Sequence, residues 1–339
     1  MYKYIIFLLC LLTSCGPDKD KSDKERFFIR GNDKLKIREY QEAINFYDEA
    51  IIIDRNYALA YNNRGIAKFE TDRYHEAVLD YSTAISIDPD FIDAYFNRSN
   101  AYLQLALYDK SLEDLKIVEA ARPDLPQVQF FKGLVFTEMK EYKNALEAFE
   151  TAKKSDPENV ETWINIGTVR YYLGMYDEAK KNLLDVIQKN PQQADAYNVL
   201  GLIMLETKDY KEANDYFNKA INLNPNQGFY INNRGRVKLY LDDIKGAEED
   251  INKSIILDPY NAWAYKNKGI IHLKKNEPEA ALRLLKQAEK LNNEIELLYY
   301  HIGEAYMALN NKSLACEAFK TSESKGEINN AKLVKEICN

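Results

Sequence analysis

Residues 58–91 read ALAYNNRGIAKFETDRYHEAVLDYSTAISIDPDF, and residues 194–227 repeat this arrangement as ADAYNVLGLIMLETKDYKEANDYFNKAINLNPNQ. Each stretch has 34 residues, with a glycine at its eighth position. The same glycine recurs at this period, interrupted once by Ser99, at Gly31, Gly65, Gly133, Gly167, Gly201, Gly235, Gly269 and Gly303. A fixed period without insertions predicts a solenoid, in which each unit packs only on its neighbours.

The residue types at the other periodic positions predict two helices per unit. Small residues at positions 8, 20 and 27, such as Gly65, Ala77 and Ala84, let two antiparallel helices approach closely. Large residues at positions 4, 11, 17 and 24 fill the space between helices and between units. Proline at position 32, such as Pro89, ends the second helix because it lacks an amide proton. We therefore expect an all-α fold.

This combination of positions resembles the tetratricopeptide repeat (TPR) family, from Lys24 to about Glu327. The resemblance implies a right-handed superhelical solenoid of nine helix–turn–helix repeats. The expected repeats are 24–57, 58–91, 92–125, 126–159, 160–193, 194–227, 228–261, 262–295 and 296–327. Residues 328–339 would form a capping helix, whose apolar face covers the exposed end of the stack.

The start of the chain predicts export and lipidation. Residues 1–14 combine a lysine, the apolar stretch 5–12 and small residues, which is typical of a secretory signal. Leu12–Cys15 resembles the bacterial lipobox, and this resemblance implies that Cys15 becomes the acylated first residue of the mature chain. An ordinary cleaved signal is the alternative. Residues 15–25 would form a charged tether between the lipid and the repeats.

The residue after Cys15 bears on localisation. In enteric bacteria an aspartate there would imply retention at the inner membrane, and this chain has Gly16 instead. The resemblance therefore favours the outer membrane of a bacterial envelope, on either its periplasmic or its surface face.

Composition narrows the classes of partner and cofactor. The formal net charge of −7 and the lack of a polybasic tail argue against nucleic acid as a partner. His75, His272 and His301 lie far apart in sequence with no paired ligand nearby, so we expect no metal site. The sequence has no nucleophile elbow, phosphate-binding glycine loop or zinc-type histidine pair. We therefore expect neither an enzyme nor a cofactor.

Two cysteines fall near the C-terminus, Cys316 in the ninth repeat and Cys338 in the expected cap. Outside the cytoplasm they could form a disulfide that holds the cap on the stack. Two buried thiols are the alternative.

Position 6 is an asparagine in five repeats, at Asn63, Asn97, Asn165, Asn233 and Asn267. In TPR proteins the first helix of each repeat lines a concave groove, so the resemblance places these side chains there. An amide can pair with both the carbonyl and the amide of a peptide backbone, and such a row could hold an extended peptide. Asparagine is also common at this position in the family, which leaves a purely structural explanation open.

Aromatic residues fall at other groove positions. We expect Phe130, Tyr171 and Trp263 to contact a partner. The same class of position also holds Phe96, Phe131, Tyr172, Phe229, Tyr240 and Tyr300. Exposed in a groove, such side chains mark a binding surface; buried, they are core.

Charge is uneven along the expected groove. Repeats two to six carry acids there, at Glu70, Asp93, Glu138, Glu161, Asp195 and Glu206. Repeats seven and eight carry Arg236, Lys266 and Lys274 instead. We expect this basic end to take an acidic group or a C-terminal carboxylate, with ordinary surface variation as the alternative.

Three functions fit these features. The leading hypothesis is a lipid-anchored adaptor that binds protein or peptide partners in its groove in the bacterial envelope. The alternatives are a receptor for a small or polymeric envelope ligand, such as a peptidoglycan peptide or glycan, and a structural spacer. The sequence leaves the partner, the membrane face and the oligomeric state open.

Overall fold

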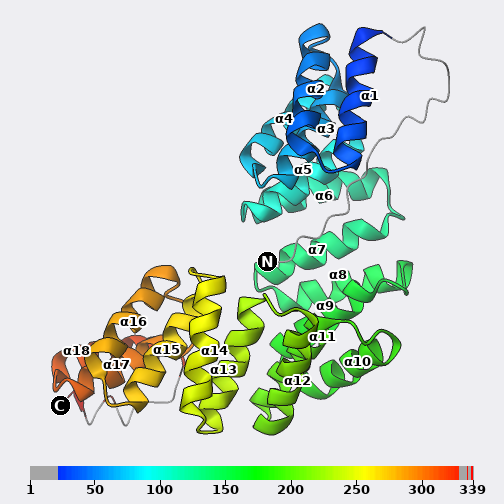
Figure 1. The fold of residues 1–339 in the computed structure, drawn as a ribbon. Helices are drawn as coiled ribbons and strands as arrows, with labels where there is room; N and C mark the ends of the chain where they lie inside the picture. Colours follow the sequence, from blue (N-terminus) through cyan, green and yellow to red (C-terminus); the bar gives the residue numbers. More distant parts are fainter. Residues whose placement is uncertain (1–21, 328–333, 335–336, 339) are drawn as a thin grey trace. The chain divides into compact units, whose positions relative to one another are not determined.

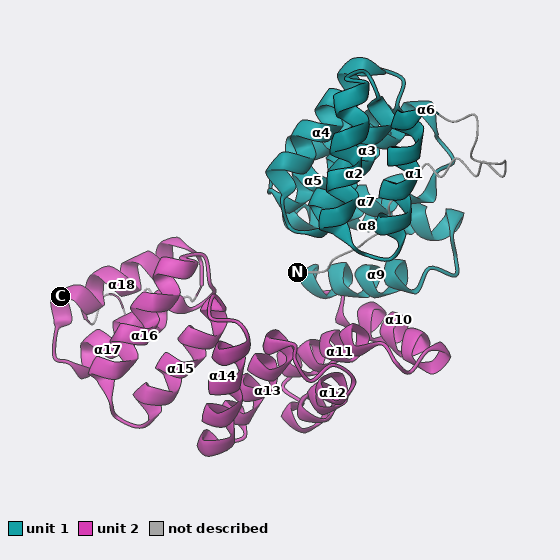
Figure 2. Cartoon of the chain, turned by 45° about the horizontal axis from the view of Figure 1, so that its top comes forward, with its two compact units in different colours: residues 1–173 teal, residues 174–339 magenta. Residues whose placement is uncertain are grey.

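The computed structural model describes residues 22–327, 334, 337 and 338, and every element bounded within them is a helix. The chain divides into two compact units, the first ending at Leu173 and the second beginning at Gly174 (Figures 1 and 2). Unit 1 contains α1 (Asp23–Lys36), α2 (Tyr40–Ile53), α3 (Ala58–Glu70), α4 (Tyr74–Ile87), α5 (Ile92–Gln104), α6 (Tyr108–Ala121), α7 (Pro126–Glu138), α8 (Tyr142–Ser155) and α9 (Val160–Tyr172). Unit 2 contains α10 (Tyr176–Lys189), α11 (Ala194–Glu206), α12 (Tyr210–Leu223), α13 (Gly228–Tyr240), α14 (Ile244–Leu257), α15 (Ala262–Lys274), α16 (Pro278–Leu291), α17 (Leu298–Ala308) and α18 (Lys312–Ser324).

Within each unit the helices pack in chain order as hairpins. Unit 1 stacks α1/α2, α3/α4, α5/α6 and α7/α8, with α9 against α8. Unit 2 stacks α11/α12, α13/α14, α15/α16 and α17/α18, with α10 against α11. In repeats two to eight the first helix begins at the first residue of the repeat expected from the 34-residue period. The period of the sequence is therefore the period of the helix pairs.

The periodic glycines lie where the two helices of a hairpin meet. A Cβ added at Gly65 would lie 2.6 Å from the Tyr81 ring, and one at Gly133 would lie 2.6 Å from the Phe149 ring. Both distances are too short for any side chain, so these positions require glycine. Ser99 stands at this position in the third repeat, where the smaller Leu115 replaces the ring, and its hydroxyl donates to the Phe96 carbonyl at 2.6 Å.

The turn inside each repeat has a second periodic feature, a residue in the left-handed backbone region at position 15. The nine residues are Arg38, Asp72, Ala106, Lys140, Gly174, Lys208, Asp242, Asn276 and Asn310. The next amide then donates to a carbonyl near the end of the first helix, for example Leu107 N to Tyr102 O at 2.9 Å and Glu141 N to Phe136 O at 2.8 Å. Such bonds satisfy carbonyls that the helix end leaves free. Because eight of the nine residues are not glycine, no glycine signal marked this turn.

We expect Ala106→Gly to stabilise the protein. Ala106 has φ 56°, where a Cβ is strained, and glycine should relieve about 0.5–1 kcal/mol after its larger entropy in the unfolded chain is counted. The matched control is Ala120→Gly, at an exposed alanine in the last turn of α6 with right-handed helical backbone, which should not stabilise the protein and should cost up to about 1 kcal/mol. Urea unfolding of the wild type and the two variants measures both changes in the free energy of unfolding. A loss of stability in Ala106→Gly would contradict the expectation.

The N-terminal boundary differs slightly from the expected one. The helix α1 begins at Asp23, where the Ser22 amide donates to the Glu25 carboxylate at 3.0 Å. Asp23–Glu25 are therefore helical, and the tether expected at residues 15–25 can extend only to Ser22. The signal peptide and Cys15 lie outside the described residues. Among the described residues, no helix is long and apolar enough to cross a bilayer.

Candidate functional site

The position-6 asparagines lie inside the stack. Asn63, Asn97 and Asn267 are at most 1% exposed, so they cannot contact a peptide laid on the surface. The side-chain amide of each donates a hydrogen bond to an asparagine of the preceding repeat. Asn63 donates to Asn32 at 2.8 Å, and Asn97 donates to Asn62 at 3.0 Å. The structure thus corrects the peptide-ladder interpretation for these three residues, because the neighbouring repeat occupies their hydrogen-bonding groups.

The other members of the row follow the same pattern in part. Asn267 donates to Asn232 at 2.9 Å, and the half-buried Asn233 donates to Asn198 at 3.0 Å. Asn165 donates to the Glu161 carbonyl of its own helix at 2.9 Å. An asparagine at position 6 therefore mainly joins one repeat to the next.

The aromatic residues divide into core and surface. Phe130 is buried and meets Phe131 and Phe149 edge-on, so its expected contact with a partner is wrong. Phe96 and Phe131 are buried as well. Tyr171 is half-buried beside Tyr172.

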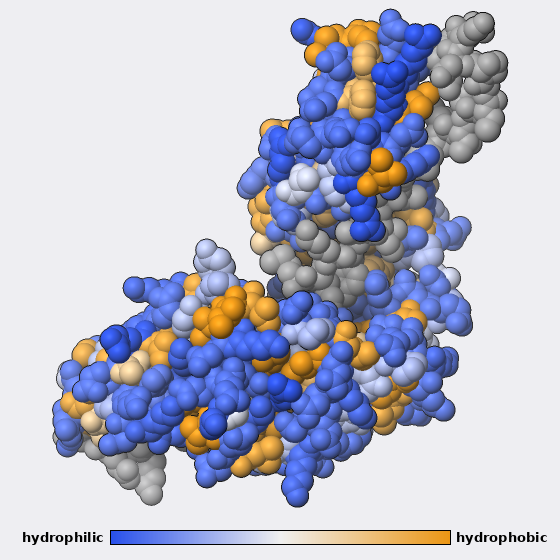
Figure 3. Space-filling view, viewed as in Figure 1, coloured by the Kyte–Doolittle hydropathy of each residue, from blue (hydrophilic) through white to orange (hydrophobic). Residues whose placement is uncertain are grey.

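Three groove aromatics remain on the surface. Trp263, Tyr172 and Tyr240 are 38%, 49% and 52% exposed. Tyr240 stacks on Tyr210 with ring centroids 4.8 Å apart. The visible face of the molecule is largely hydrophilic, with hydrophobic side chains in separate patches (Figure 3). Aromatic rings with this much exposed surface are accessible to a partner.

The three basic residues of the seventh and eighth repeats all belong to unit 2. Arg236 on α13 faces Glu206 at 3.8 Å, which is a loose ion pair. Lys274 is exposed at the end of α15. Lys266, on the same helix, is only 4% exposed. The helices α13 and α15 are in contact, and Arg236 lies near enough to Lys266 to affect the pKa of its ammonium group.

Lys266 has an uncommon environment for an ammonium group. Its Nζ donates to the Glu296 carbonyl at 2.8 Å and lies 4.3 Å from the centroid of the Trp263 ring. Among the described residues, no carboxylate lies within ion-pair distance of it. Burial first, and the nearby Arg236 second, lower the pKa of Lys266 to about 7, against the attraction of Glu296 and Glu327.

Some of the groove acids have internal partners. Asp93 is buried and pairs with Arg122 at 2.5 Å, and Asp195 accepts a hydrogen bond from the Tyr230 hydroxyl. Some of the carboxylates expected to face a partner therefore interact with side chains of their own unit.

The sequence analysis did not predict a set of arginine–aspartate pairs inside the repeats. Arg98 at position 7 donates from two nitrogens to Asp114 at position 23, at 2.8 Å each, and also to Ser82 of the preceding repeat at 3.0 Å. Arg64 with Asp80, and Arg234 with Asp250, form the same bidentate pair. The sequence did contain a signal, since aspartate occurs at position 23 only in repeats with arginine at position 7.

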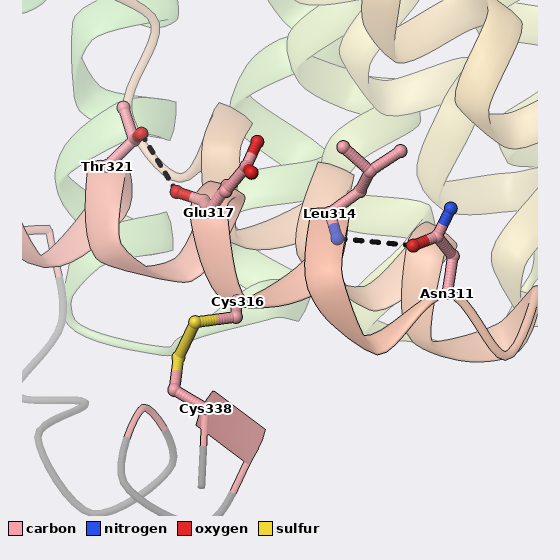
Figure 4. Close-up of a disulfide and its surroundings, with 6 residues drawn as sticks. All are labelled: Asn311, Leu314, Cys316, Glu317, Thr321 and Cys338. Atoms are coloured by element: carbon pink, nitrogen blue, oxygen red, sulfur yellow. Dashed lines mark hydrogen bonds between the residues drawn. A yellow bond between two sulfur atoms is a disulfide. The ribbon is translucent and has the colours of Figure 1, made fainter.

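Cys316 and Cys338, considered in the sequence as a pair, form a disulfide with Cα atoms 5.2 Å apart (Figure 4). Val334 is buried there against Ala315 and Phe319 of α18. The bond attaches the C-terminal segment to the last repeat. Most of the expected capping helix lies outside the described residues.

Family models identify the helix pairs. A TPR repeat model matches residues 67–105, and tetratricopeptide repeat models match residues 96–160, 164–227 and 297–332. The chain carries tetratricopeptide repeats. No curated protein sequence matches it.

The fold of this chain is similar to that of a solved structure over most of its length. A chain in the crystal structure of the APC/C hetero-tetramer Cut9–Hcn1 is 15% identical, with a TM-score of 0.66 over 93% of this chain and 76% of that one. A tetratricopeptide repeat protein from Parabacteroides merdae ATCC 43184 is 18% identical, with a TM-score of 0.47 over 83% and 98% of the two chains. MamA from Desulfovibrio magneticus RS-1 is 20% identical, with a TM-score of 0.48 over 51% and 98%. At 15% identity, the first of these similarities supports the fold and not a function.

A TPR fold is typical of proteins that bind other proteins. The TPR repeats described here thus point to a scaffold for protein–protein interaction.

Proposed function

We propose that this chain is a lipid-anchored adaptor of the bacterial envelope that binds an acidic protein segment or a C-terminal carboxylate. The binding surface, termed the basic face, consists of Arg236, Tyr240, Trp263, Lys266 and Lys274 on α13 and α15. The lipid anchor rests on the resemblance of Leu12–Cys15 to the lipobox, and outer-membrane location rests on Gly16.

The environment of Lys266 is the observation that supports a negatively charged partner. A buried ammonium without a carboxylate partner is costly, and folded proteins retain such groups mainly where function requires them. An anionic group bound beside Lys266 and Arg236 would stabilise the charged amine and relieve the repulsion between the two cations. The exposed parts of the Trp263 and Tyr240 rings add apolar contact area for a partner.

Photo-crosslinking in the native cell tests this proposal. A photoreactive residue at Tyr240 or at Trp263 should capture the same envelope protein, identified by mass spectrometry, because both side chains are exposed on the basic face. Capture of lipid alone, or of no protein at all, would contradict an adaptor that uses this surface. Palmitate labelling of the wild type and of Cys15→Ser tests the anchor separately.

We expect Arg236→Glu/Lys274→Glu to abolish capture of that protein. The double reversal changes the charge of the basic face by four units and should weaken binding of an acidic segment by about 100-fold or more. The matched control is Lys245→Glu/Lys290→Glu, an equal change at exposed lysines on α14 and α16, and capture should persist there. Equal loss in both variants would show that net charge, and not the basic face, decides binding.

A further inference from the structure

A trio of residues occupies the same place in the second and third repeats. The trio consists of Tyr61, Arg64 and Asp80 in the second repeat and of Tyr95, Arg98 and Asp114 in the third. The Arg64 guanidinium carbon lies 5.2 Å from the centroid of the Tyr61 ring, and its N–H groups donate to two carboxylates, Nε and Nη2 to Asp80 and Nη1 to Asp48. In both repeats a guanidinium is thus held between a ring and a carboxylate.

The fourth repeat departs from the trio at all three positions, which hold Gln129, Lys132 and Ala148. A cavity of about 480 Å³ opens there between α6, α7 and α8 of unit 1. Gln129, Lys132 and Ala148 themselves line it, together with Phe136 and the carboxylates of Glu119 and Glu147. The cavity therefore stands where the two preceding repeats place their internal arginine.

The lining is negative and has one apolar wall. Lys132 donates to Glu119 at 2.5 Å, and Gln129 donates to the same carboxylate at 2.5 Å, so both side chains are drawn toward α6. Glu147 forms no ion pair with any described residue. Two carboxylates against one ammonium leave a net negative charge beside the half-buried Phe136 ring.

We propose that this cavity binds the guanidinium group of an arginine side chain presented by a protein partner. The partner's arginine replaces the internal one that the fourth repeat lacks. Its guanidinium donates to Glu119 and Glu147, and its methylene stem packs along Phe136. This site lies in unit 1 and does not depend on the basic face of unit 2.

The chemistry selects arginine over other groups. A guanidinium is planar and carries five donors, so it can stack on a ring and bridge two carboxylates at once. A lysine ammonium is a compact, strongly hydrated charge that does neither as well. The negative lining repels anionic ligands.

The test uses the full chain and the probe N-acetyl-arginine methylamide, followed by amide chemical shifts in NMR. We expect shifts confined to α6, α7 and α8, binding at least about fivefold weaker for the lysine analogue, and no saturable shifts for the neutral citrulline analogue. Equal responses to arginine and citrulline, or shifts spread over other repeats, would overturn the proposal.

Two variants separate the site from general charge. Gln129→Tyr/Lys132→Arg/Ala148→Asp restores the trio and should fill the cavity. The affinity for the arginine probe should then fall at least about tenfold. Glu119→Gln/Glu147→Gln keeps the shape and should weaken binding by a similar factor, so it decides the matter if the triple variant does not fold. Undiminished binding in either folded variant would show that the arginine site lies elsewhere.

Discussion

Asp114→Ala should lower the free energy of unfolding of the protein by about 3 kcal/mol or more. The Asp114 side chain is 5% exposed and receives two hydrogen bonds of 2.8 Å from Arg98. Removing one partner of a buried pair leaves the other charge without compensation, which typically costs about 3–5 kcal/mol. Arg98 keeps its bond to Ser82 and its place over Tyr95, so we expect the lower end of this range.

Two controls make this result specific. Arg98→Leu/Asp114→Tyr copies the sixth repeat, where Leu200 and Tyr216 stand at the same positions, and should recover most of the loss. Glu289→Ala removes a partner of the more exposed pair with Lys286 and should cost less than about 1 kcal/mol. If Asp114→Ala were no more costly than Glu289→Ala in urea unfolding, the buried pair would not stabilise the helix hairpin of the third repeat.

Lys266→Met should stabilise the protein at pH 7 and change how its stability depends on pH. The pKa of Lys266 falls from its usual 10.5 to about 7 in the folded chain. Between these two values the unfolded chain binds a proton that the folded chain does not, so the free energy of unfolding rises with pH. The slope for one group is at most about 1.4 kcal/mol per pH unit.

Methionine at this position has no proton to release, so the variant should lack that part of the slope. At pH 7 it should be about 1–4 kcal/mol more stable than the wild type, because it fills the same space without a buried charge. By pH 9.5 most of this cost of the buried charge should be gone, and the last part, about 1.4 kcal/mol, should be lost only as the pH rises through the unfolded pKa of 10.5. Urea unfolding at both pH values measures it, and Lys274→Met on the exposed end of α15 should stay parallel to the wild type. Equal slopes in the wild type and Lys266→Met would contradict the buried amine.

The cost of Lys266 bears on function. A sequence selected for stability alone would place an apolar residue there, as isoleucine and valine stand at other buried positions of the stack. If Lys266→Met is more stable but no longer binds the partner, the lysine is retained for recognition. If it is more stable and still binds, recognition rests on Arg236, Lys274 and the aromatic side chains.

The sequence predicted most of the fold because every repeat has the same packing requirement. A Cβ at Gly65 or Gly133 would lie 2.6 Å from a ring of the second helix, and this requirement for glycine recurs at a period that can be counted in the sequence. The left-handed turn at Ala106 and Lys140 was not foreseen, because these residues carry no composition signal and adopt the conformation only to close the hydrogen bonds of the turn.

The candidate sites were predicted less well, since they depend on what covers a side chain. Asn97 was placed correctly on the first helix of its repeat. Its side-chain amide, however, donates to Asn62, 35 residues earlier, so it is not available to a ligand. Phe130 shares the helix face expected to line a groove and is nevertheless core. A helical period defines a face of one helix, and it does not say whether the next repeat covers that face.

By itself, then, the sequence determined the repeat, the helix pairs, the places that require glycine, and the resemblance to a lipobox at Cys15. Only the tertiary structure decided that Asn63 and Asn97 join repeats, that Lys266 is buried while Lys274 is exposed, and that a cavity opens at Ala148. The physical reason is the range of the interactions. Packing within a repeat acts over a fixed spacing along the chain, whereas burial and charge depend on neighbours that only stacking brings into contact.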